Sequence, residues 1–103
     1  LHGWICGVSG LIYHTSDSGR TWTRQKSHQD NSLNGLFFIN PNEGWVVGGH
    51  GTVLHTIDGG KVWRPQQCET QFNLNAVHMA SPELGWIIGD LGTILRHMVI
   101  DPI

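Results

Sequence analysis

Short apolar runs separated by turns rich in glycine and asparagine make up most of this chain of 103 residues. In its central part the apolar runs cover residues 33–40, 44–48, 52–56 and 62–66. Runs of this length between turn signals predict four short β-strands joined as an antiparallel meander. The runs are continuous rather than alternating, which indicates strands buried on both faces of their sheet. No helical periodicity survives the glycines, so a helical solenoid is excluded.

This pattern repeats every 41 residues without a gap. The dipeptide Gly-Trp marks each unit, with its tryptophan at Trp4, Trp45 and Trp86, and 45 − 4 = 86 − 45 = 41. A fixed period of this size indicates stacked supersecondary units, and a meander covered on both faces by identical neighbours is the arrangement of a β-propeller blade. We therefore predict one all-β domain over 1–103, a partial β-propeller of about 2.5 four-stranded blades. Its units are 3–43, 44–84 and the incomplete 85–103.

Five tryptophans are available for packing. Trp4, Trp45 and Trp86 each lie inside an apolar strand, so we expect them to pack between blades, although aromatic platforms also suit sugar binding. Trp22 and Trp63 lie in turns, where we expect partial exposure.

The turns around Trp22 and Trp63 share the motif Thr-x-Asp-x-Gly-x-x-Trp. In such a turn the aspartate can accept backbone N–H bonds, and the glycine can adopt the left-handed conformation that a bulged hairpin needs. We therefore interpret both aspartates as structural rather than catalytic. The motif residues are Thr15, Asp17, Gly19 and Trp22 in the first unit, and Thr56, Asp58, Gly60 and Trp63 in the second.

This motif resembles the Asp-box of sialidase-type (BNR-like) propellers, where it stabilises a hairpin of the blade. The longer run from Gly44 through Trp63 resembles the repeats of the photosystem II assembly and stability factor family, the Ycf48-like proteins, and the resemblance extends from Gly3 to about Leu95. It implies a closed propeller that binds a client membrane protein outside the cytoplasm.

The chain departs from the family pattern in two ways. It holds too few blades to close, and it lacks a third Asp-box, because the matching positions are occupied by His97, Val99 and Asp101. The sequence leaves the cellular compartment of the protein unknown, and only the family resemblance points outside the cytoplasm.

The charge pattern excludes several classes of function. The net charge is −2 and the six cationic side chains are scattered, so we expect no nucleic-acid partner. No apolar run approaches the roughly 18 residues of a membrane-spanning helix, so we expect no membrane insertion. We find no catalytic arrangement of carboxylates or nucleophile with base, and we expect no enzyme and no cofactor. Cys6 and Cys68 allow a disulfide, although two idle thiols are the favoured interpretation.

Candidate binding residues are those that vary inside the fixed repeat. His14 and His55 share one repeat position, which Arg96 occupies in the third unit, so the three side chains could form a strip that binds an acidic segment. A polar residue at this position could equally be a habit of the repeat. Two histidines without a third ligand do not make a zinc site, and we expect no metal. The turns at Val8–Gly10, His50–Gly51 and Asp90–Gly92 vary most, and we expect the working surface there.

We predict a non-catalytic binding or scaffolding module for a protein or peptide client, which closes by association with itself. A short stack of blades exposes apolar faces that favour association. Two chains supply 206 residues, close to five units of 41, so a dimer is favoured. The alternative is that the chain is a piece of a longer polypeptide. Other hypotheses are a remnant of a sialidase-like glycan-binding or glycan-processing propeller, and a foldable gene fragment without independent function.

Overall fold

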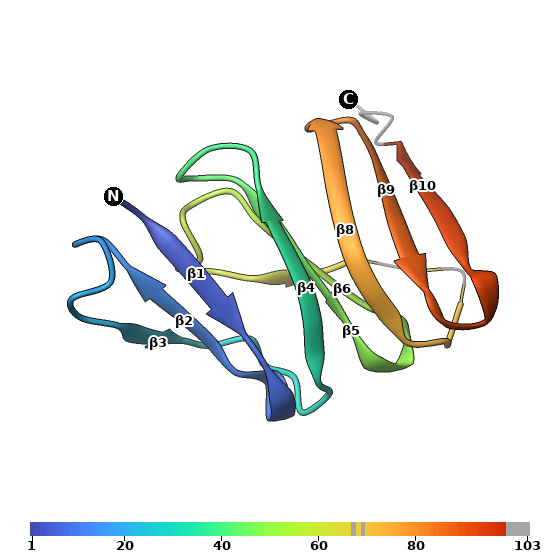
Figure 1. Ribbon diagram of the computed structural model, residues 1–103, viewed down its shortest axis with the longest axis horizontal. Coiled ribbons are helices and arrows are strands. Elements are labelled where there is room, and N and C mark those ends of the chain that lie inside the picture. Colours follow the sequence, from blue (N-terminus) through green and yellow to red (C-terminus); the bar gives the residue numbers. More distant parts are fainter. Residues whose placement is uncertain (67, 69, 99–103) are drawn as a thin grey trace.

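The computed structural model describes residues 1–66, 68 and 70–98, with the backbone alone for 96–98. It contains three antiparallel sheets that stand side by side (Figure 1), which confirms the all-β prediction. The tail Val99–Ile103, which the third repeat unit includes, lies outside the described residues. The first sheet consists of β1 (Gly3–Cys6), β2 (Ile12–Thr15) and β3 (Thr23–Gln25); the second of β4 (Leu33–Phe38), β5 (Gly44–Gly48), β6 (Thr52–Thr56) and β7 (Arg64–Pro65); the third of β8 (Leu74–Ser81), β9 (Leu84–Gly89) and β10 (Ile94–Met98).

The second sheet is the complete meander that the sequence predicts, in the order β4-β5-β6-β7. Its first strand ends earlier than expected, because the side chain of Asn40 accepts the backbone N–H groups of Asn42 and Glu43 at 2.8 and 2.9 Å and turns the chain. Its last strand is only two residues long, and Pro65 lies at a position that faces away from β6, where no N–H is needed for the ladder.

Each gap between neighbouring sheets is filled by its own apolar core. The core between the first and second sheets is built on Ile12, Leu33, Val46, Leu54 and Trp63. The core between the second and third sheets is built on Trp45, Val47, Val53, Leu74, Val77, Met79 and Ile87. Because successive side chains of a strand point to opposite faces, β5 contributes to both cores, and all five of its residues are buried. The prediction of strands buried on both faces is therefore confirmed for β5, whereas β7 is exposed.

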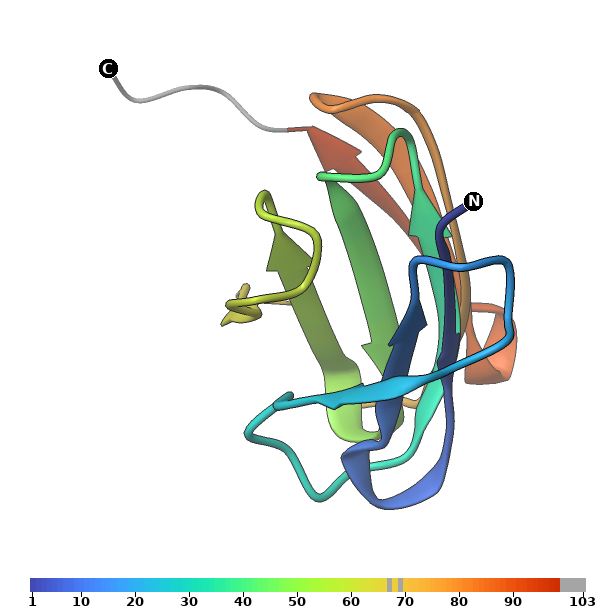
Figure 2. The ribbon, with the colours of Figure 1, turned by 90° about the vertical axis from the view of Figure 1, so that its left-hand side faces the viewer.

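The three sheets stand side by side, with corresponding strands of each sheet on the same side of the molecule. Strand β4 lies between β1 and β8 (Figure 1), and the outer strands β3 and β7 lie along the opposite side (Figure 2). The short turns η1 (Val8–Gly10), η2 (Gly49–Gly51) and η3 (Asp90–Gly92) join consecutive strands at one common end of the sheets. We call this end the turn end. The two aspartate-containing hairpins lie at the opposite end.

Candidate functional site

The turn end presents one protruding side chain from each sheet. The middle residue of each turn has a left-handed backbone, with φ of 58° at Ser9, 57° at His50 and 59° at Leu91. Residues other than glycine adopt this conformation rarely. All three side chains are exposed, and Leu91 is exposed to 83 %. The three blades therefore offer a hydroxyl, an imidazole and an aliphatic group from the same backbone frame.

The chain that links the second sheet to the third holds η2 and η3 in place. The N–H of Gly51 donates to the carbonyl of Phe72 at 3.0 Å, and the N–H of Asp90 donates to the carbonyl of Asn73 at 2.9 Å. The N–H of His50 also donates to Oδ1 of Asn73 at 3.2 Å. Backbone groups of the turns are thus satisfied by the link, which leaves the side chains of the turn end free for other contacts.

A cavity of about 600 Å³ opens between η2 and η3. At its edge the two carboxylate oxygens of Asp90 accept hydrogen bonds from Nδ2 of Asn73 at 3.1 Å and of Asn75 at 3.0 Å. The apolar side chains of Phe72 and Leu91 lie beside this fixed carboxylate. An apolar surface with a few oriented polar groups is typical of binding sites. The cavity is lined by His50, Gln71, Phe72, Asn73, Asp90 and Leu91.

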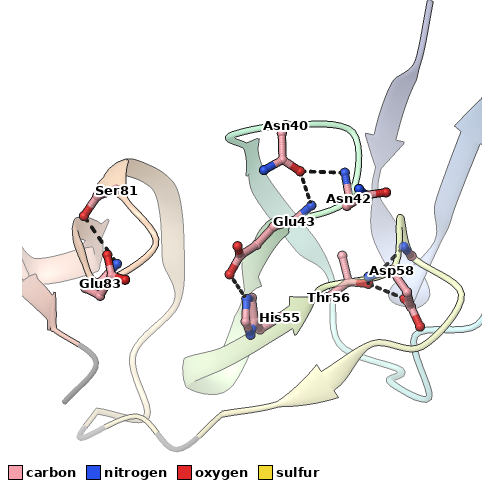
Figure 3. A network of polar contacts seen from close by, with 9 residues as sticks. Asn40, Asn42, Glu43, His55, Thr56, Asp58, Ser81 and Glu83 are labelled. Atoms are coloured by element: carbon pink, nitrogen blue, oxygen red, sulfur yellow. Dashed lines mark hydrogen bonds and ion pairs between the residues drawn. The ribbon is translucent and has the colours of Figure 1, made fainter. Parts of the chain in front are cut away.

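His55 is engaged inside its own sheet. Its Nε2 lies 2.8 Å from Oε2 of Glu43 (Figure 3), and its ring stacks on Trp45 with 4.8 Å between the ring centroids. Glu43 could not be identified as the partner of His55 from the sequence, because Glu43 directly precedes β5 whereas His55 lies in β6. The side chain of His55 is still about one-fifth exposed, at 19 %.

His14 occupies the equivalent position in the first sheet and stacks on Trp4 at 4.8 Å between centroids. Its Nε2 lies 2.9 Å from Nδ1 of His2. Burial, and then the neighbouring His2, lower the pKa of His14. Arg96 pairs with Trp86 in the ladder of β9 and β10, and its side chain lies outside the described part of the chain. The structure thus places each of the three at the same position of its sheet, opposite a tryptophan.

The hairpins Thr15–Trp22 and Thr56–Trp63, which we call the Asp17 hairpin and the Asp58 hairpin, are closed by their own polar groups. The hydroxyl of Thr56 donates to Oδ1 of Asp58 at 2.8 Å, and the N–H of Val62 donates to the same oxygen at 3.0 Å. Hydrogen bonds from the backbone of Val62 and from the Thr56 hydroxyl lower the pKa of Asp58. Figure 3 shows the Thr56–Asp58 contact.

The carboxylate of Asp17 accepts one more hydrogen bond than the carboxylate of Asp58. Thr21, which stands where the second unit has Val62, donates to Asp17 from both its hydroxyl and its backbone N–H. These bonds and the one from the Thr15 hydroxyl lower the pKa of Asp17. Both aspartates are occupied as acceptors inside their turns, which is a structural use.

The Asp58 hairpin is also clasped to the first sheet, a contact that sequence analysis missed. The amide of Gln25 donates to the carbonyl of Gly59 at 2.9 Å and accepts from Nε1 of Trp63 at 3.1 Å. A Cβ at Gly60, where φ is +92°, would collide with this amide. Trp63 also packs in the core between the first and second sheets and is only 3 % exposed, so the expected partial exposure is wrong for this residue.

Trp22 shows what the hairpin looks like without a clasp. Its Nε1 donates to the carbonyl of Gly19 in its own turn at 3.1 Å, and the side chain is 41 % exposed, as expected from the sequence. The signal for the clasp was available, because Gln25 and Gln66 occupy the same repeat position. A glutamine in a short outer strand does not by itself say which neighbour it contacts.

Other chemistry is sparse in the described part of the chain. No three histidine, cysteine or acidic side chains gather there as a metal site would require. Cys6 and Cys68 are both free thiols, and burial raises the pKa of Cys6. No helix of the described residues is long and apolar enough to cross a membrane.

Comparison with known proteins places the chain in a family. The family model described as photosynthesis system II assembly factor YCF48 matches residues 25–98, well over half of the chain. The chain belongs to the YCF48 family. The resemblance inferred from the Gly-Trp repeat is thereby confirmed.

A solved structure agrees with this assignment. The structure described as "YCF48 bound to D1 peptide" matches with a TM-score of 0.81 and 30 % sequence identity over 94 % of this chain. The match covers 33 % of the YCF48 chain, so the present chain spans about a third of its length. No curated protein sequence matches the chain.

Proposed function

We propose that this chain is a non-catalytic propeller-type module that binds a protein or peptide client and closes by association with a second copy. Membership of the YCF48 family supports the client, since the similar YCF48 structure is described as bound to a D1 peptide. The observation that carries the proposal is the turn end, where the repeat frame is constant and the exposed side chains differ from blade to blade.

The cavity between η2 and η3 is the proposed centre of client binding. A peptide side chain can pack on Phe72 and Leu91 while its polar groups meet the fixed carboxylate of Asp90 and the ring of His50. His14, His55 and Arg96 remain a proposed secondary contact for an acidic segment. The two hairpins, which we propose to be Asp-boxes, serve the fold and leave the turn end as the variable surface.

A D1 peptide is the probe that tests this surface. We expect the chain to bind a fluorescent D1 peptide and Leu91→Asp to weaken binding about tenfold, because a charge then replaces an apolar contact. Aspartate tolerates the left-handed conformation at this position, so the variant should fold. Ile57→Asp, at an exposed position away from the turn end, is the matched control. Equal affinity of the two variants would rule out the turn end.

The self-association rests on two apolar sheet faces that the described chain leaves open. The third sheet exposes Trp86, whereas the equivalent Trp45 is buried by the next sheet, with exposed fractions of 41 % and 1 %. Ile88 and its equivalent Val47 differ in the same way, at 53 % and 0 %. We call Trp86, Ile88 and Ile94 the third-sheet face.

The first sheet has the complementary open face. Ile5 is exposed and Tyr13 half-buried, although their equivalents Val46 and Leu54 are fully buried under the first sheet. We call Ile5, Tyr13 and Trp22 the first-sheet face. Since each open face repeats a surface that already packs inside the chain, the third-sheet face of one copy fits the first-sheet face of another. Two chains contribute six sheets in total, within the roughly four to eight blades of closed propellers.

Two charge variants test this head-to-tail arrangement. Trp86→Asp and Ile5→Asp should each lower the association of the chain, because each spoils one of the two faces. When the two variants are mixed, the intact third-sheet face of Ile5→Asp can pack on the intact first-sheet face of Trp86→Asp. We therefore expect the mixture to show a higher mass by light scattering than either variant alone. A mixture that stays as light as its components contradicts the arrangement.

No observation favours the glycan-processing alternative. The carboxylates of Asp17 and Asp58 are held by hydrogen bonds in separate hairpins, whereas glycoside hydrolysis needs a pair of carboxylates that face a common cleft.

A further inference from the structure

The cavity between η2 and η3 contains a carboxylate that departs from the repeat. Asp90 stands where the first two units have Val8 and Gly49, neither of which carries a charged side chain. Asn73, one of the two hydrogen-bond partners of this carboxylate, stands at the position of Ser32. The charged group and one of the side chains that orient it are therefore specific to this cavity.

Two amide side chains fix the orientation of the Asp90 carboxylate. Nδ2 of Asn73 donates to Oδ2 of Asp90 at 3.1 Å, and Nδ2 of Asn75 donates to Oδ1 at 3.0 Å. The backbone N–H of Asp90 donates to the carbonyl of Asn73 at 2.9 Å, so the main chain of Asp90 is held by the same link. Both amides are neutral and orient the carboxylate without balancing its negative charge. Because a carboxylate oxygen accepts more than one hydrogen bond, each of the two oxygens can still accept one from a ligand.

Apolar side chains line the same cavity as this carboxylate. Phe72 is 48 % exposed and Leu91 is exposed to a still larger extent. None of the six described side chains that line the cavity is a lysine or an arginine, and its volume of about 600 Å³ holds one long side chain. An aromatic ring and an oriented carboxylate in one cavity suit a ligand group that is cationic and planar. An exposed aliphatic side chain beside them suits an apolar stem on that group.

We propose that this cavity binds the side chain of an arginine in the client peptide. Two N–H groups of the guanidinium donate to the two oxygens of Asp90, its plane stacks on the ring of Phe72, and its methylene stem packs on Leu91. Lysine supplies the same charge as a point and lacks the planar pair of donors that matches a carboxylate. The inference rests on the proposed protein-binding function and names the chemistry of the client residue that the cavity selects.

A series of blocked peptides tests the proposal on the unchanged chain. The peptides share the sequence Gly-Ser-Leu-X-Leu-Ser-Gly, with arginine, lysine or citrulline at X; citrulline has the shape of arginine but no charge. Binding is followed by NMR at the backbone N–H signals of Asp90 and Leu91. The arginine peptide should bind about tenfold more tightly than the citrulline peptide and about threefold more tightly than the lysine peptide. Equal affinities of the arginine and citrulline peptides would overturn the proposal.

Variants of the chain separate the charge of Asp90 from its orientation. Asp90→Asn removes the charge at nearly constant size and should abolish the preference for arginine over citrulline. Asp30→Asn, at an exposed position between β3 and β4, changes the net charge equally and is the matched control. Asn75→Ala keeps the charge but removes one of the two orienting hydrogen bonds, so arginine and lysine should then bind alike and both above citrulline. An unchanged preference in Asp90→Asn, or a lost preference in Asp30→Asn, contradicts the proposal.

Titration of the D1 peptide on the same chains distinguishes failure of this inference from failure of the proposed function. If the D1 peptide binds at the turn end while the arginine and citrulline peptides bind equally, the arginine assignment is wrong and the client-binding function stands. If neither the D1 peptide nor the arginine peptide binds, both are wrong. The peptide series uses the unchanged chain, so its outcome does not depend on whether a variant folds.

Discussion

The second and third sheets of this chain are built from the same repeat but bury its apolar positions to different extents. In β5 every residue is buried, whereas in β9 burial alternates, with Trp86 and Ile88 exposed. The residue types hardly differ, so the contrast arises from the neighbours: among the described residues, the second sheet is covered on both faces and the third on one. The tryptophan face of the second sheet is therefore buried by the sheet that follows it.

The largest difference in stability should appear when the equivalent tryptophans of the second and third sheets are replaced by alanine. Trp45→Ala should cost about 3–5 kcal/mol of unfolding free energy, because it leaves a cavity in a core that is closed on all sides. Trp86→Ala should cost about 1 kcal/mol in dilute solution, where its side chain is partly solvated. Denaturant unfolding at low protein concentration measures both. Equal costs would mean that the third sheet is covered in the isolated chain, which would contradict the exposure of Trp86.

The two equivalent glutamines sharpen the comparison at the outer strands. Gln25→Ala should destabilise the chain by about 1–3 kcal/mol, since it leaves the buried indole N–H of Trp63 without a partner. Gln66→Ala should stay within about 0.5 kcal/mol of the unchanged chain, because its side chain makes no hydrogen bond to another described residue. Thermal unfolding of the two variants side by side is the measurement. A larger cost at Gln66 would contradict the assigned clasp.

The smallest expected effect is on the loss of folding stability at acid pH. The folded pKa values of Asp17 and Asp58 are lowered by hydrogen bonds, whereas in the unfolded chain they return to about 4. The stabilisation is therefore complete above this pH and is lost as the pH falls below it. Asp17→Asn should flatten the acid dependence more than Asp58→Asn, because only Asp17 accepts the extra hydroxyl of Thr21. Melting temperatures between neutral and acid pH measure this, and the reverse order would contradict it.

The strands and the blade architecture could be predicted because they depend on local signals. Apolar runs, turn glycines and the 41-residue period place the strands of the second sheet to within two residues. The end of β4 differs because a single side chain, that of Asn40, turns the chain. The candidate site was predicted less well, because it depends on contacts between units.

Trp63 illustrates this limit. Its motif describes a turn that looks the same in both units. One indole is buried because the preceding sheet packs on it and supplies the amide of Gln25, whereas Trp22 has no preceding sheet among the described residues. Likewise His55 could be placed on its strand from the repeat, but its contact with Glu43 required the geometry of the sheet. A repeat shows which residues are equivalent but does not show which neighbour each of them contacts.

Self-association of the chain can be measured as its molar mass in solution, by light scattering over a range of concentrations. If the first-sheet and third-sheet faces pack on each other, the mass should rise with concentration to twice the 11.4 kDa of one chain, and Trp86→Asp should prevent the rise. A mass that stays at 11.4 kDa at every concentration, with a cooperative thermal transition, would contradict self-association through these faces.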